Sequence, residues 1–79
     1  MDWEDRITTD PKIMVGKPVV RGTRMTVEFL LDRFADGWTE RDILDSYPHL
    51  TPDDLRAVFA YAADCMKDGV IFRSPEITG

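Results

Sequence analysis

Residues 51–69 read TPDDLRAVFAYAADCMKDG, and this stretch carries the strongest helix pattern in the chain. Thr51 is a good N-cap, and Pro52 suits the first helical position because proline lacks an N–H. The Asp53-Asp54 pair that follows places negative charge at the positive end of the helix dipole. Gly69 is expected to end the helix, since glycine adopts the left-handed cap conformation at little cost. The expected buried face repeats at helical spacing and contains Leu55, Val58, Phe59, Ala62, Cys65 and Met66.

Two shorter helices are expected before this one, joined to it and to each other by tight turns. The first covers about residues 27–36, with Thr26 as its N-cap and Gly37 placed to end it. The second begins at Thr39, has Asp42 three residues later in a capping-box arrangement, and ends before Pro48. Their apolar side chains are Val27, Leu30, Leu31 and Phe34 in the first, and Ile43, Leu44 and Tyr47 in the second.

The first third of the chain has an extended, turn-rich pattern. Ile7-Thr8-Thr9 favours one short strand and Lys17-Pro18-Val19-Val20 a second. A ribbon this short is stable only when it packs on helices or on a second copy. The predicted fold is therefore mainly α and forms one domain. It has a short N-terminal β-ribbon (1–25), a three-helix core compatible with helix-turn-helix folds (26–69) and a C-terminal arm (70–79).

Size and composition describe a small folded protein. The 79 residues provide one modest core, and 43% hydrophobic with 32% charged residues is typical of globular chains. The single cysteine excludes an internal disulfide. No apolar run approaches the roughly 18 residues of a membrane span, and no signal-type stretch follows the acidic start. We therefore expect a cytoplasmic protein.

The net charge of −5 is unevenly distributed. Residues 1–24 contain five basic and four acidic side chains, whereas residues 25–79 contain five basic and eleven acidic ones. Guanidinium and ammonium groups in the ribbon suit phosphate or carboxylate. The alternative is that these cations pair with acids of the helix over 27–36. The predicted nucleic-acid-binding residues are Lys12, Lys17, Arg21, Thr23 and Arg24.

No set of residues predicts catalysis. Proton transfer and nucleophilic catalysis need a base near a nucleophile, or paired carboxylates. The only histidine, His49, lies in a proline-flanked loop that we expect to be exposed, and Cys65 lies on the buried face of the third helix. Glu28, Asp32 and Asp36 are explained as one solvated helix face, and Asp53-Asp54 as a helix start. We therefore expect a binding protein that is not an enzyme and uses no metal or cofactor.

Several short motifs, taken in order, resemble the family called domain of unknown function 433. They are Arg6-Ile7-Thr8, Gly16-Lys17-Pro18, Arg21-Gly22-Thr23-Arg24, Gly37-Trp38-Thr39 and Tyr47-Pro48-His49-Leu50-Thr51. The resemblance runs from about residue 6 to residue 66, and the last ten residues lie outside it. It implies a homeodomain-like, dimeric fold, a link to VapB-type antitoxins and a neighbouring gene for a PIN-like nuclease. The family has no assigned catalytic residues, so the resemblance implies none here.

The expected function is that of an antitoxin-like protein. It binds and neutralises a cognate PIN-like nuclease toxin, and it represses its own operon when the basic ribbon of a homodimer binds DNA. The acidic side chains of the third helix would repel the phosphates of DNA, so this helix suits a basic protein partner instead. The alternative function is a protein–protein interaction module with no nucleic-acid role. The predicted partner-binding residues are Asp53, Asp54 and Asp64, with Ile71 and Phe72 of the arm.

Two further expectations concern packing. The N-terminal segment is expected to pair or pack across the symmetry axis of the homodimer, because a short ribbon has an unpaired edge. Phe34 and Phe59 lie on the apolar stripes of the first and third helices and are expected to face each other. Replacing Phe59 by Ala is then expected to cost about 3–5 kcal/mol of stability.

Overall fold

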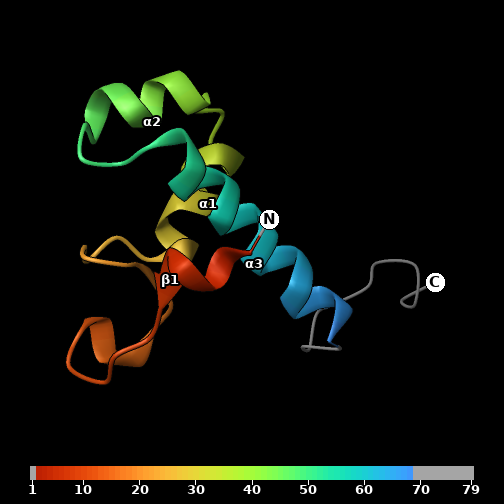
Figure 1. The fold of residues 1–79 in the computed structure, drawn as a ribbon. Coiled ribbons are helices and arrows are strands. Elements are labelled where there is room, and N and C mark those ends of the chain that lie inside the picture. The colour runs from red at the N-terminus through yellow and green to blue at the C-terminus, as the bar shows by residue number, and fades with distance from the viewer. Residues whose placement is uncertain (1, 69–79) are drawn as a thin grey trace.

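A computed structural model describes residues 2–68 and contains a short β-ribbon packed against three α-helices (Figure 1). The helices are α1 (Val27–Ala35), α2 (Glu40–Ser46) and α3 (Pro52–Lys67). Before them come two short 3-10 turns, η1 (Trp3–Asp5) and η2 (Met14–Gly16), and two strands, β1 (Ile7–Thr8) and β2 (Val19–Val20). The predicted fold class, mainly helical with a short N-terminal ribbon, is confirmed. The expectations for Gly69 and the arm over 70–79 lie outside the described residues.

The helix ends are formed by the residues that the sequence indicated. Thr26 Oγ1 accepts the Phe29 N–H at 2.9 Å, and Gly37 has a φ of +97° just after α1. A complete capping box opens α2 at Thr39 and another opens α3 at Thr51, each satisfying two helix-terminal or cap N–H groups. These local contacts fix where each helix starts, and hence where the ribbon meets them.

The two strands are antiparallel and shorter than predicted. Ile7 pairs with Val20 and Thr8 with Val19. The ribbon does not extend to Pro18, which has no N–H to donate, but the Pro18 carbonyl oxygen accepts the Val27 N–H at 2.9 Å. This bond ties β2 to the start of α1. The loop between the strands projects away from the helices (orange, Figure 1).

The core joins the ribbon to all three helices. Its buried apolar side chains include Ile7, Val19, Val20, Leu30, Ile43, Leu50, Leu55 and Val58. The predicted buried face of α3 was partly wrong: Phe59 and Met66 are 48% and 56% exposed, whereas Ala57 is fully buried. The face is turned because η1 and β1 also pack on α3. The predicted contact between Phe34 and Phe59 is confirmed, with ring centroids 4.8 Å apart.

Candidate functional site

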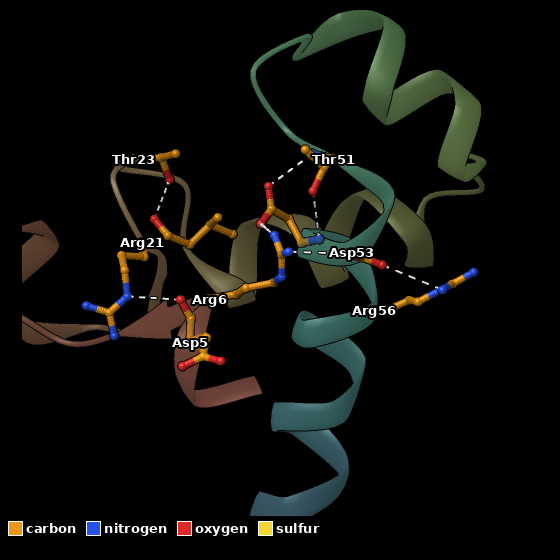
Figure 2. Close-up of polar contacts among 9 residues, drawn as sticks. Asp5, Arg6, Arg21, Thr23, Thr51, Asp53 and Arg56 are labelled. Carbon is orange, nitrogen blue, oxygen red and sulfur yellow. Dashed lines mark hydrogen bonds and ion pairs between the residues drawn. The ribbon is translucent and has the colours of Figure 1, made fainter. Parts of the chain in front are cut away.

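Two of the five ribbon residues predicted to bind nucleic acid are fastened to the chain's own backbone. Arg21 donates from Nε to the Asp5 carbonyl oxygen at 3.1 Å (Figure 2) and from Nη2 to the Glu4 carbonyl oxygen at 3.0 Å. Thr23 Oγ1 donates to the Val20 carbonyl oxygen at 2.8 Å and so closes the turn after β2. Both side chains therefore hold the ribbon in shape, although Arg21 is exposed and keeps its positive charge, because its two partners are neutral carbonyl oxygens.

A third predicted residue, Lys17, pairs with an acid of α1, as the alternative interpretation expected. Its Nζ lies 3.0 Å from Glu28 Oε1, and both side chains are more than half exposed. An exposed ion pair of this kind contributes little and is screened by salt. Lys17 can therefore exchange Glu28 for an external anion at small cost.

Lys12 and Arg24 are the ribbon cations that remain free. Both residues are exposed, and within residues 2–68 neither side chain forms a hydrogen bond or an ion pair. Lys12 is held only through its backbone N–H, which donates to Asp10 Oδ1 at 2.9 Å. These two ribbon cations therefore have all of their side-chain hydrogen-bond donors available to a partner.

Between these two cations in the sequence, the chain turns through an unusual backbone conformation. Met14, Val15 and Gly16 all have positive φ, of 48°, 50° and 82°. The left-handed region costs a non-glycine residue roughly 1–2 kcal/mol, and a β-branched side chain such as that of Val15 is among the least tolerant. Val15 is nevertheless 86% exposed, so its side chain gains almost no packing inside the chain.

A cavity of about 270 Å³ opens beside this turn. It is lined by Met14, Arg24, Met25, Thr26, Phe29 and Tyr47. Phe29 and Tyr47 meet edge to face with centroids 5.9 Å apart, and the Arg33 guanidinium lies 5.0 Å above the Phe29 ring. We call this cavity, together with the exposed side chains of Lys12, Met14, Val15 and Arg24, the loop surface. It combines an apolar hollow with two unpaired positive charges.

Asp54, one of the predicted partner-binding acids, is a structural residue. It is only 8% exposed. Its Oδ2 accepts the Thr51 N–H at 3.0 Å, and its Oδ1 accepts from Arg6 Nη1 at 3.1 Å. Figure 2 shows Arg6 reaching toward the start of α3, just after its N-cap Thr51. A carboxylate engaged in this way is not available to a partner.

The other predicted partner-binding acids are also engaged within the chain, although less completely. Asp53 lies 3.6 Å from Arg6 Nη2 on one side and 3.6 Å from Arg56 Nη1 on the other. Asp64 Oδ2 accepts the Trp3 Nε1–H at 2.6 Å. The remaining two predicted partner residues, Ile71 and Phe72, lie outside the described part of the chain. The acids of α3 therefore fasten the N-terminal segment to this helix.

The only histidine and the only cysteine of the chain were the remaining candidates for a reactive site. His49 is exposed, as expected, and Cys65 is half-buried beside Tyr61. Burial, and then the neighbouring Cys65 thiol, raises the pKa of Tyr61. Within residues 2–68 no group of three His, Cys, Asp or Glu side chains is placed to hold a metal ion. Over the same residues, no helix has the length and apolarity needed to cross a bilayer.

Sequence reasoning missed Arg6 and the cavity. Arg6 is 48 residues from Asp54, so no local pattern links the two. The cavity collects side chains from the loop, from α1 and from the end of α2. The one sequence feature that marked this region was the run of cations without acids around Met14 and Val15.

Comparison with known proteins places the chain in a family. The family model described as "Protein of unknown function (DUF433)" matches residues 7–62. The uncharacterized protein y4eO of Sinorhizobium fredii is 36% identical over 56 residues, which are 71% of this chain and 25% of that protein. The crystal structure of a DUF433 member from Anabaena variabilis superposes with a TM-score of 0.76 at 28% identity, over 82% of this chain and 64% of that one. The chain thus spans about a quarter of the first relative and under two thirds of the second. The motifs, the fold and the family match agree, and the chain belongs to the DUF433 family.

Proposed function

We propose that this protein is an antitoxin-like binding module of the cytoplasm, which binds and neutralises a PIN-like nuclease encoded beside it. The observation that carries the proposal is the loop surface: Arg24, an exposed cation without a partner within residues 2–68, lines an apolar cavity, and Lys12, equally exposed and without a partner there, lies in the same loop as Met14. Such a surface is suited to a protein partner, because apolar contacts supply affinity and charges supply orientation. The protein itself needs no catalytic group for this role.

The surface that we assign to the partner differs from the one expected from sequence. Asp53, Asp54 and Asp64 are engaged with Arg6, Arg56 and Trp3 and contribute to stability. The two exposed charged side chains of the loop surface, Lys12 and Arg24, are cationic. A partner with acidic groups, such as the metal-binding carboxylates of a PIN-like nuclease, fits this charge better than a basic groove does.

Co-expression tests this function. We expect the product of the adjacent reading frame to co-purify with the untagged full chain, and its cleavage of RNA to stop at equimolar antitoxin. Retention of a different protein, or unchanged cleavage in the presence of excess chain, would refute the antitoxin role.

Operator binding is the second candidate function, and the free Lys12 and Arg24 favour it. Each phosphate contact contributes about 0.9 to the slope of log affinity against log salt concentration. Changing Lys12 and Arg24 to Ala should therefore flatten this slope by about 2 per chain, and changing Arg56 to Ala should do less. Absence of binding to the upstream DNA at low salt would leave the protein–protein module with no nucleic-acid role.

A further inference from the structure

The choice of valine at position 15 of the loop has no explanation in the packing of the chain. Val15 has φ 50° and ψ 38°, and 86% of its surface remains exposed. Glycine or asparagine adopts this conformation at lower cost. Residues held in such conformations concentrate at functional sites, where the surrounding structure maintains them. Here the neighbouring turn does so: the Ile13 N–H donates to the Asp10 carbonyl oxygen at 2.8 Å, and the Lys17 N–H donates to the Met14 carbonyl oxygen at 3.1 Å.

The cavity beside the loop has the size and lining of a side-chain pocket. Its volume of about 270 Å³ lies just below the roughly 300–1,000 Å³ of small-molecule sites. Two methionines and two aromatic rings line it, and methionine adapts readily to different apolar groups. The one polar side chain among the lining residues besides Arg24 and Tyr47 is Thr26, whose hydroxyl already caps α1. The pocket is therefore suited to one large apolar side chain.

The positive charges of the loop surface indicate which groups of a partner would lie next to the side chain in the pocket. Arg24 lines the pocket, and Lys12 lies two residues before Met14 in the loop. Both are exposed and lack partners within residues 2–68. A guanidinium without an internal partner binds a carboxylate through two parallel hydrogen bonds. Carboxylates next to the inserted side chain would therefore complement this rim.

We propose that the loop surface docks a segment of a partner protein in which a large apolar side chain is flanked by carboxylates. The apolar side chain occupies the pocket, the carboxylates bind Arg24 and Lys12, and Val15 packs against the segment. This inference rests on the protein-binding role proposed above and names the surface and the partner chemistry. Nucleic acid fits less well, because a phosphate backbone has nothing to place in an apolar pocket.

The first experiment selects ligands from a display library of random peptides, with the full chain immobilised. We expect the enriched peptides to carry Asp or Glu beside Phe, Trp, Leu or Met. A selected peptide, labelled for fluorescence anisotropy, should bind Arg24→Glu about tenfold or more weakly. The matched control is Arg41→Glu, since Arg41 is 90% exposed on α2 and away from the pocket lining.

A second variant separates binding from folding. Val15→Asn removes the exposed apolar side chain and relieves the left-handed strain, so its Tm should rise by about 4–8 °C. Its affinity for the selected peptide should nevertheless fall by about tenfold. A variant that is more stable and binds more weakly is the expected mark of a residue kept for contact rather than for folding.

The outcomes that overturn the inference are distinct from those that overturn the antitoxin role. No enrichment, enriched peptides without acids, or affinity unchanged in Arg24→Glu and Val15→Asn would each refute the proposed surface. Displacement of the peptide by duplex DNA at low concentration would make the loop a nucleic-acid surface instead. If the adjacent gene product co-purifies equally with both variants, the surface is wrong and the antitoxin role stands. If peptides bind as predicted and the adjacent gene product does not bind, the proposed surface stands and the antitoxin role is wrong.

Discussion

At the scale of single residues, Arg6 determines how the acidic start of α3 behaves. Its guanidinium lies 3.1 Å from Asp54 and 3.6 Å from Asp53. The sequence places two negative charges at this helix end, whereas the folded chain brings a positive charge to both of them. The side chain of Asp54 is 12% exposed, so its carboxylate has little contact with water and is stabilised by the Arg6 guanidinium and the Thr51 N–H.

Replacing Arg6 by Ala should lower the free energy of unfolding by about 1–2 kcal/mol, a value between those of exposed and buried ion pairs. The loss arises because a mostly buried carboxylate is left without its cation. Urea unfolding followed by circular dichroism measures it. Arg56→Ala is the control: Arg56 is 74% exposed and, within residues 2–68, forms an ion pair with Asp53 alone, so the loss should stay below about 0.5 kcal/mol. Equal losses in the two variants would contradict the role given to Arg6.

Asp42 provides a pH-dependent contact in the short helix α2. The Thr39 N–H donates to its Oδ2 at 2.8 Å, and this backbone bond, followed by the Thr39 side chain, lowers the pKa of Asp42 below its ordinary 3.8. Because the folded-state pKa is lowered, the contribution of Asp42 to stability is complete above pH 3.8 and is lost as the pH falls through the lowered pKa. Asp42→Asn should be less stable than the parent at neutral pH, and this difference should shrink in acid. Thermal unfolding across that range checks it, and a constant difference would refute the assignment.

At the scale of elements, α3 shows which features of a helix can be predicted from its own sequence pattern and which cannot. Its N-cap, its first turn and its contact with Phe34 followed from the sequence, because these features depend on neighbouring residues or on one helix face. Its orientation did not, because η1 and β1 cover the side of α3 that bears Ala57. Those contacts join residues far apart in the chain, which periodicity within one helix does not record.

The cost of shortening Phe59 follows from this orientation. Since Phe59 is 48% exposed, Phe59→Ala should cost about 1–2 kcal/mol instead of the 3–5 kcal/mol of a buried aromatic. Leu30→Ala, at a fully buried position of α1, should cost about 2–5 kcal/mol. Urea unfolding of both variants tests this ranking. A larger loss for Phe59→Ala would mean that the exposed part of its ring is covered in solution, for instance by a second copy.

At the scale of the whole molecule, the sequence predicts the fold class more completely than it predicts the candidate site. Helices, caps and the ribbon arise from local chemistry, and all were expected. The candidate site proposed above includes part of the segment that the sequence indicated, but the sequence did not distinguish the free cations from the engaged ones. Arg21 differs from Arg24 only because the backbone of η1 lies beside it, with the Glu4 and Asp5 carbonyl oxygens within reach. Such differences depend on tertiary contacts.

The homodimer stays a prediction at this scale. A small core and the exposed apolar side chains of Phe59 and Met66 favour association. We expect sedimentation equilibrium at micromolar concentration to give about twice the chain mass of 9.1 kDa. Dilution should dissociate the dimer and lower the Tm, because association of folded chains stabilises the folded state. A clean 9.1 kDa species at the same concentration would exclude the dimer.

The bond between Trp3 and Asp64 has a kinetic consequence. It joins residues 61 positions apart, so it closes nearly the whole described chain into a loop, and such closure comes late when local contacts form first. The helices should then form before the N-terminal segment docks on α3. The indole of Trp3 meets the Tyr61 ring edge to face with centroids 4.8 Å apart, whereas Trp38 stacks on Tyr47, after α1 and α2. A chain keeping only Trp3 would therefore show, in stopped-flow refolding, a fluorescence change that follows the recovery of helical circular dichroism.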